Sequence, residues 1–197
     1  MRVLLAAILG GAVFFVWSFV AHDMLGLGEV GIKDIPSEQT VVSELRNSIT
    51  QPGFYFIPGV GLPPNATSEQ KKAAMQQFQQ KIASGPFGIL IYHPVGADVQ
   101  NLSRQLPREF GLNVVVALIM AILVAWAAPS SFASRLGFVT LAGIMVTLLT
   151  NVEYWNWFGF PLNYTLAAMA TQVIGFFLAG IVIALIVRPR STRTSTY

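Results

Sequence analysis

An uncharged apolar stretch, Leu162–Val187, constrains the fold of this chain more than any other feature. It is long enough to cross the hydrocarbon core of a bilayer as a helix, which takes about 20 apolar residues. Arginines follow it at once, at Arg188, Arg190 and Arg193. We therefore predict a membrane-spanning helix whose C-terminal end is held in the cytoplasm.

The chain has too few charged residues to cover a water-soluble surface. Charged residues make up 11% of the sequence and hydrophobic residues 54%, whereas soluble domains carry about 25% charged residues. Lipid must therefore solvate much of the chain. The net charge of +3 is small and arises at membrane borders, so it does not indicate nucleic-acid binding. The absence of cysteine excludes disulfides, thiolate metal sites and cysteine nucleophiles.

Three further apolar runs are typical of membrane spans: Val3–Val20, Phe110–Ala127 and Leu136–Val152. The first run has a competing interpretation as a cleaved signal peptide. We favour a retained anchor, because only Arg2 supplies a basic region and the run is long for a leader. The turn between the second and third runs is short, which predicts antiparallel neighbouring helices.

The predicted fold class is a membrane all-α bundle of four transmembrane helices, with a small outer α/β insert between helices 1 and 2. Its parts are a signal-anchor helix at residues 1–21, an extracytoplasmic insert at 22–108, a three-helix transmembrane region at 109–188 and a cytoplasmic tail at 189–197. An insert of this length can be translocated whatever its charge, so its own lysines and arginines do not decide the topology.

The insert carries signals for helices. Ser37–Ile49 and Thr67–Ala83 have apolar residues at helical spacing, and Thr67 with Gln70 fits a capping box. Asp98–Leu106 is predicted to form a short interfacial helix that ends before Pro107.

Two strands are predicted in the same insert, at Phe54–Ile57 and Ile89–Tyr92, from their β-branched and aromatic residues. Each follows a helix, and Gly53–Gly61 resembles Gly88–Gly96. This similarity suggests a helix–strand repeat, whose strands would be parallel with a right-handed crossover. Chance similarity between two short apolar segments is the alternative. Two strands alone are marginal in water, which suggests association with a partner.

Small and polar residues mark helix-packing faces in the predicted spans. In the first span they are the pairs Ala6/Gly10 and Ala7/Gly11. In the third span they are Thr140, Gly143, Thr147 and Asn151. In the fourth span they are Ala168, Thr171, Gln172, Gly175 and Ala179.

The charges at the ends of the spans predict the topology. Four spans put both termini on one side, together with all arginines outside the insert: Arg2, Arg135, Arg188, Arg190 and Arg193. Only Glu153 lies in the short loop on the other side. The positive-inside rule therefore places both termini in the cytoplasm and residues 22–108 outside. If the first run is cleaved, three spans remain and the C-terminus stays inside.

Familiar catalytic patterns are missing from the sequence. The centres of the spans carry no charged residue and no Gly/Pro break, which argues against a pump or a secondary transporter. There is no phosphate-binding loop, no G-x-S-x-G element and no HExxH helix. The sequence therefore assigns no catalytic, cofactor-binding or metal-binding residue, and it favours a non-enzymatic role.

Two groups of residues are candidates for ligand binding. His22, Asp23, Glu29 and His93 have the side chains that bind zinc, although their spacing matches no metal motif. Hydrogen-bonded histidines without a metal are the alternative. Glu153–Pro161 holds the aromatics Trp155, Trp157 and Phe160, which suit headgroup anchoring or a docking platform.

We therefore expect a non-catalytic accessory, assembly or scaffold subunit of a membrane complex, located in a bacterial inner membrane. Its expected partners are the lipid bilayer and another membrane protein or a second copy of the chain, and no nucleic acid. One alternative is an extracytoplasmic protein that binds or senses a small ligand or metal. Another is a lipid- or quinone-handling protein, with an apolar cavity between spans three and four near Trp155, Trp157 or Phe160.

Overall fold

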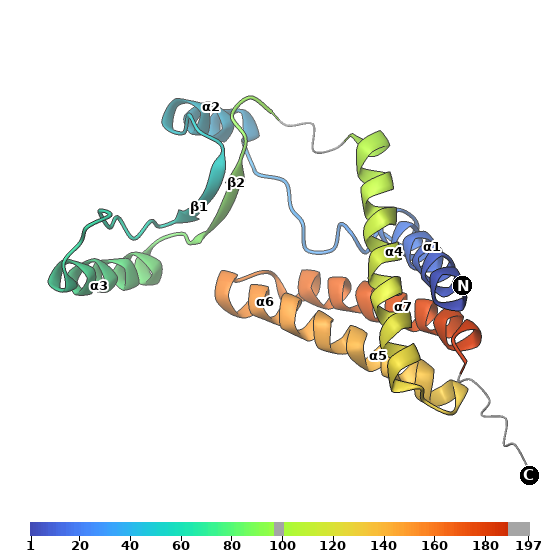
Figure 1. The fold of residues 1–197 in the computed structure, drawn as a ribbon. Coiled ribbons are helices and arrows are strands. Elements are labelled where there is room, and N and C mark those ends of the chain that lie inside the picture. Colours follow the sequence, from blue (N-terminus) through green and yellow to red (C-terminus); the bar gives the residue numbers. More distant parts are fainter. Residues whose placement is uncertain (97–100, 189–197) are drawn as a thin grey trace, which may run out of the picture. The chain divides into compact units, whose positions relative to one another are not determined.

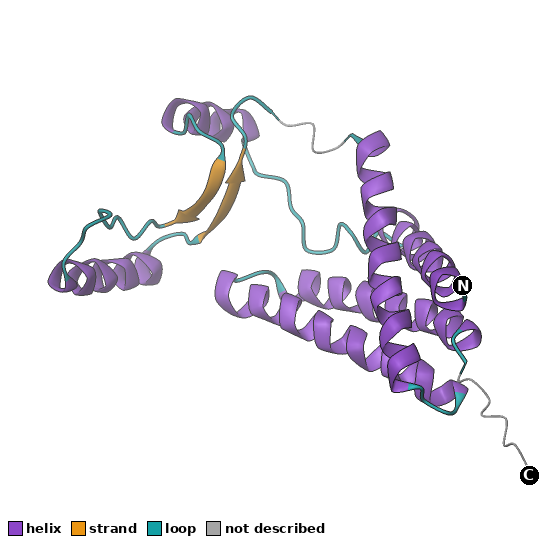
Figure 2. Cartoon of the chain, in the orientation of Figure 1, coloured by secondary structure: helices purple, strands orange, loops and turns teal. Residues whose placement is uncertain are grey.

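The computed structural model describes residues 1–96 and 101–188. The chain forms two compact units, the membrane unit (Met1–Ile32 with Val99–Tyr197) and the insert unit (Lys33–Asp98). Helices dominate both units (Figure 1), and the β-structure of the described residues is one two-stranded sheet (Figure 2).

Four helical segments of the membrane unit are long and apolar enough to cross a membrane, which confirms the predicted number of apolar helices. In chain order they are α1 (Arg2–Phe19) with the π-helical turn η1 (Val20–Met24), α4 (Leu102–Ala127), α5 (Phe132–Thr147) with the π-helical turn η3 (Leu148–Val152) and α6 (Glu153–Phe158), and α7 (Leu162–Ile186).

Two predicted boundaries in this unit are wrong. The separate interfacial helix before Pro107 does not exist, because α4 begins at Leu102 and continues through Pro107. Pro107 is the sixth residue of α4, where it removes one backbone hydrogen bond, and the helix nevertheless continues past it. Residues 98–100 of that prediction lie outside the described residues. The aromatic segment is not a loop either, since α6 is helical up to Gly159, whose φ of 68° ends the helix.

Helix α1 packs against both α4 and α7, and α7 also packs along α5. Helices α4 and α5 contact each other little and meet at their short connection (Figure 1). The core contains Ala117, Ala121, Val139, Phe176 and Ile183. Many of these side chains are small, so the helix backbones approach closely.

Glycines decide how close the helices come. A Cβ atom at Gly11 would lie 2.6 Å from the Cα atom of Val114 in α4. A Cβ atom at Gly143 in α5 would overlap the side chain of Phe176 in α7. Ala6, Ala7 and Gly10 are also buried. The predicted small-residue faces are therefore used within this chain, as expected for helices that pack in lipid.

The insert unit contains α2 (Glu38–Ser48), β1 (Gly53–Ile57), α3 (Ser68–Ser84) and β2 (Gly88–Tyr92). The capping box is confirmed: Gln70 N–H donates to Thr67 Oγ1 at 3.2 Å, and Thr67 N–H donates to Gln70 Oε1 at 2.8 Å. Both predicted strands also form, as do the helices predicted at Ser37–Ile49 and Thr67–Ala83.

The predicted parallel arrangement of the strands is wrong, because β1 and β2 pair antiparallel with Gly53 opposite Tyr92 and Ile57 opposite Gly88. A parallel pair needs a crossover helix that packs on the sheet and carries the chain back to its starting end. Helix α3 instead lies beyond one end of the strands (Figure 1) and does not pack extensively on them. The start of β2 therefore lies next to the end of β1.

Candidate functional site

A partly open cavity of about 610 Å³ lies between helices of the membrane unit and is lined by α1, η1, α4, α5, η3 and α7. Its apolar lining includes Phe14, Phe15, Leu112, Val116 and Phe176. Amide, hydroxyl and carboxyl groups complete the lining and come from all of the contributing spans. The cavity therefore combines apolar walls with a small polar region, which is the usual composition of a ligand site.

The best-connected polar group in this cavity is the amide of Asn151 in η3. Its Nδ2 donates to Gln172 Oε1 in α7 at 2.9 Å and to the backbone oxygen of Thr147 at 2.9 Å. Asn151 is 8% exposed. The pair joins the third and fourth spans through the face that the sequence predicted, because buried amides in lipid bond across helices.

Thr147 lies one turn before Asn151 and is fully buried. Its Oγ1 has no hydrogen-bond partner, which sets it apart from the other buried side-chain oxygens and nitrogens that the structure describes. An unpaired buried hydroxyl costs about 1–3 kcal/mol.

A second polar pair reaches the cavity from α4. Asn113 is 6% exposed, and its Nδ2 donates to Glu109 Oε1 at 3.3 Å. Both residues line the cavity. The two sit one helical turn apart, and this spacing could have been noticed in the sequence. What the sequence could not show is that α4 turns this face toward η3 and α7.

Two described π-helical turns of the membrane unit, η1 and η3, contribute to the cavity. His22 and Asp23 come from η1, and Thr150 and Asn151 come from η3. A π-turn is wider than an α-turn, and such turns occur frequently at functional sites. Neither turn was predicted from the sequence, because one extra residue in a helix leaves no compositional signal.

Helix α1 is attached to α7 next to this cavity. The indole Nε1 of Trp17 donates to the backbone oxygen of Thr171 at 2.8 Å. Gly175 makes room for the approach, since a Cβ atom there would lie 2.8 Å from the ring of Phe14. Sequence reasoning missed Trp17, although a buried indole N–H usually finds an acceptor.

The proposed metal ligands do not form a metal centre within the described residues. No group of three or more His, Asp or Glu side chains lies close enough to hold one ion. His22 and Asp23 line the cavity of the membrane unit, whereas His93 belongs to the insert unit. Gly28 packs directly against the ring of His22.

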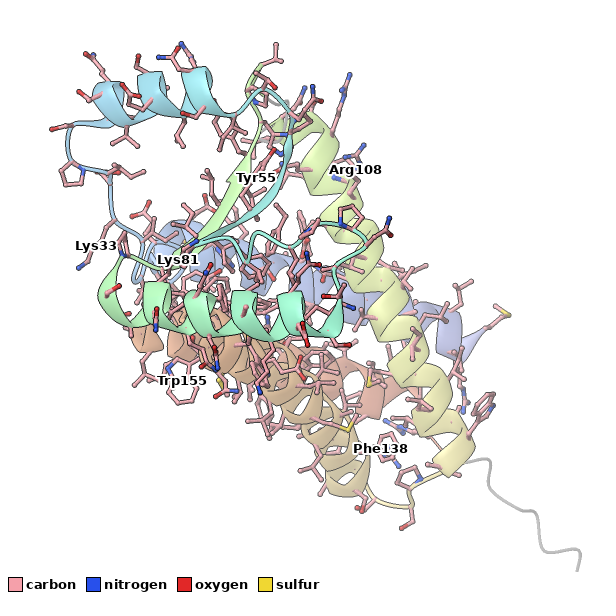
Figure 3. The ribbon with its side chains drawn as sticks, turned by 90° about the vertical axis from the view of Figure 1, so that its left-hand side faces the viewer. Lys33, Tyr55, Lys81, Arg108, Phe138 and Trp155 are labelled. Carbon is pink, nitrogen blue, oxygen red and sulfur yellow. The ribbon has the colours of Figure 1, made fainter. Side chains whose placement is uncertain are left out.

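The aromatic segment does not line the cavity, contrary to the lipid- or quinone-handling prediction. Trp157 is 73% exposed, and Trp155 also lies at the surface of α6 (Figure 3). Phe160 packs between Tyr154 and Tyr164, with ring centroids 5.4 Å and 5.6 Å away. Gly143 and Phe176 pack directly against each other in the seam between α5 and α7.

The insert unit differs because every side chain of its described helices and strands is at least partly exposed. Phe54, Phe56 and Ile91 are 54%, 50% and 70% exposed. Phe54 is opposite Ile91 in the sheet, so these side chains share one face.

The opposite face of the sheet is also apolar, with Tyr55, Ile57, Leu90 and Tyr92 alternating with the first set. Strands that are apolar on both faces are normally covered on both faces. Neither α2 nor α3 packs extensively on this sheet. The insert unit thus presents an apolar sheet without a core beneath it.

No protein-family model, curated protein or solved structure matches this chain.

Proposed function

We propose that this multi-pass membrane protein is a non-catalytic accessory, assembly or scaffold subunit, which joins a membrane complex through its insert unit. The observation that carries the proposal is the apolar two-stranded sheet without a core. A two-stranded sheet is at best marginally stable in water, and its edges invite pairing with another chain. A partner protein would cover the sheet and stabilise it.

The energy available from such a contact is considerable. Fully burying one Phe or Ile side chain contributes about 1.5–3 kcal/mol. Phe54, Phe56 and Ile91 stand on one face, so a single partner surface can cover all of them. Ordering the insert unit costs conformational entropy, which opposes this gain. The insert unit is therefore expected to be stable only when a partner covers its sheet.

The charges support a location for the proposed contact. Arg2, Arg135 and Arg188 lie at one end of the spans, whereas Arg104 and Arg108 lie near the start of α4, at the other end. Arg104 and Arg108 adjoin the long insert, whose charges do not decide the topology, so the positive-inside rule puts the end with Arg2, Arg135 and Arg188 in the cytoplasm. The insert unit would then face outward, into the periplasm if the membrane is a bacterial inner membrane. Cysteine-accessibility labelling at residue 75 and at residue 132 tests this orientation, because the chain has no cysteine of its own.

The assembly proposal is tested by extraction in native lipids through an affinity tag, followed by measurement of particle mass. We expect the wild type to carry a stoichiometric partner, either another protein or a second copy. The double variant Phe56→Ser/Ile91→Ser should lose it. Val95→Ser is the control, because Val95 is 96% exposed in the same unit but lies outside the sheet. A wild-type particle with the mass of one chain would overturn the proposal.

A second candidate function rests on the interhelical cavity. Its apolar walls and the Asn151–Gln172 pair suit an amphipathic molecule with a hydrogen-bonding head, such as a lipid or a quinone. Organic extraction of the purified protein should then release one such compound in stoichiometric amount. Gln172→Leu should lose it, whereas Asn163→Leu, on the same helix but outside the cavity lining, should retain it. An empty wild type would eliminate this function.

A further inference from the structure

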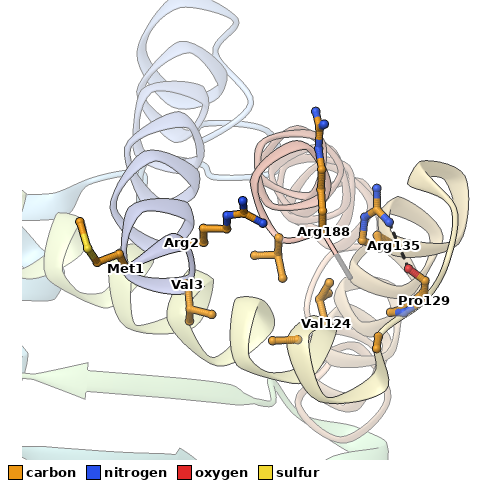
Figure 4. A pocket seen from close by; sticks show the side chains of 10 residues that line it. Met1, Arg2, Val3, Val124, Pro129, Arg135 and Arg188 are labelled. Atoms are coloured by element: carbon orange, nitrogen blue, oxygen red, sulfur yellow. Dashed lines mark hydrogen bonds between the residues drawn. The ribbon is translucent and has the colours of Figure 1, made fainter. Parts of the chain in front are cut away.

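A second cavity, of about 810 Å³, lies at the other end of the membrane unit, where α1 and α5 begin and α4 and α7 end. Three arginines line it, Arg2, Arg135 and Arg188 (Figure 4). No acidic residue is among its lining residues. Among the described lining residues, these three guanidinium groups have no acidic neighbour, so an anion that enters the cavity meets only positive charge.

Arg135 is the pre-oriented residue of this site, because it is only 6% exposed and hydrogen bonds fix its side chain. Its Nε donates to the backbone oxygen of Ala184 at 3.0 Å. Its Nη1 donates to the backbone oxygens of Pro129 and Ser130, both at 3.1 Å. Within the described residues Nη2 has no acceptor. A buried, pre-oriented guanidinium with free N–H groups is suited to an oxyanion.

Arg188 and Arg2 add two positive charges on exposed side chains, which can change conformation when a ligand binds. The Nε of Arg188 donates to the backbone oxygen of Leu185 at 3.0 Å, and its side chain is exposed. Arg2 opens α1, whose first turn has no side-chain cap. The free N–H groups of that turn and the positive end of the helix dipole also favour an anion.

We propose that this cavity binds a phosphate-bearing anion, supplied as the headgroup of an anionic phospholipid. Basic pockets between spans on the cytoplasmic side are suited to such headgroups. Val3, Val124 and Val187 line the same cavity and offer an apolar surface to the start of the acyl chains. Residues 189–197 add Arg190 and Arg193 and no acidic side chain.

The proposal is independent of the assembly function, and binding is measured directly. The protein is reconstituted in equimolar phosphatidylcholine and phosphatidylglycerol, and retained lipid is counted by native mass spectrometry. We expect phosphatidylglycerol to be retained in preference to phosphatidylcholine. Each arginine near an anionic surface contributes about fivefold in affinity. The double variant Arg2→Gln/Arg188→Gln removes two such contributions. Its affinity for phosphatidylglycerol should therefore fall by more than about tenfold.

Arg108→Gln is the matched control, because Arg108 is an exposed arginine near the start of α4 and does not line this cavity (Figure 3). It should retain phosphatidylglycerol as the wild type does. Equal retention by the double variant, or equal retention of the two lipids, would overturn the proposal. A separate arm adds inorganic phosphate to the protein in phosphatidylcholine. If phosphate alone raises the melting temperature as much as phosphatidylglycerol does, the lipid is not the source of the anion.

Discussion

The two units of this chain are stabilised in opposite ways. In the membrane unit, Gly11 and Gly143 let helices approach until no Cβ atom would fit between them, and Asn151, Trp17 and Arg135 bond from one helix to another. In the insert unit, the described helices and strands bury no side chain, and the sheet is apolar on both faces.

This difference follows from the solvent of each unit. Lipid is as apolar as a leucine side chain, so spans associate through close packing and interhelical hydrogen bonds rather than through hydrophobic burial. A segment in water depends on hydrophobic burial, and two strands with two separate helices provide little of it. The membrane unit is therefore expected to hold its structure alone, and the insert unit to depend on a partner.

The largest effect is expected where two backbones meet. Gly11→Leu should lower the free energy of unfolding in detergent by about 3 kcal/mol, because a side chain there would collide with the backbone of Val114. Gly137→Leu is the control, since a Cβ atom at Gly137 would meet nothing within 4 Å. If both variants unfold like the wild type, close approach does not hold the spans together.

A somewhat smaller loss is expected at the arginine that joins the helix ends. Arg135→Met leaves the backbone oxygens of Ala184, Pro129 and Ser130 without their donor. We expect it to destabilise the membrane unit by about 2 kcal/mol in the same unfolding assay. Arg108→Met removes the same charge from an exposed site and should have little effect. Equal losses in both variants would mean that charge, rather than hydrogen bonding, is responsible.

A gain of stability is expected at Thr147. Thr147→Val removes a buried hydroxyl that has no partner while keeping the shape of the side chain, so it should stabilise the unit by about 1 kcal/mol. Thr171→Val is the matched variant with the opposite sign, because Thr171 Oγ1 donates to the backbone oxygen of Ala167 at 3.0 Å. A loss of stability in Thr147→Val would show that its hydroxyl is paired.

The smallest effect on stability is expected in the insert unit. Phe56→Ser should change the unfolding of the membrane unit by less than about 0.5 kcal/mol, because Phe56 is half exposed and belongs to the other unit. Limited proteolysis of the purified single chain should cut within residues 33–96 before it cuts any span. A protease-resistant insert unit in a single chain would remove the contrast between the units.

Local features of the sequence predicted much of this fold. Hydropathy and length identified the four spans, and the capping box at Thr67 and Gln70 identified the start of α3. The strands β1 and β2 were also recognised from their residue types. Their direction was not, because it depends on whether α3 packs on the sheet, and an amphipathic stripe does not say which surface it covers.

The candidate cavity was predicted only in part. Asn151 and Gln172 were placed on packing faces, and the structure joins them. Glu109, Trp17 and the buried role of Arg135 went unrecognised. Each of these side chains acts through its position relative to another helix. Such positions depend on crossing angles and on π-turns, which have no sequence period of their own.

The sequence by itself determined that this chain enters a membrane, how many apolar helices it has and which small residues allow close packing. These properties depend on transfer from water to lipid and on side-chain size, which are local quantities. Only the tertiary structure decided that Arg135 donates a hydrogen bond to the backbone oxygen of Ala184 near the end of α7. It also decided that the π-turns η1 and η3 line the same cavity. Only the structure showed that α2 and α3 pack little on the insert sheet, because such packing depends on contacts between separate segments of the chain.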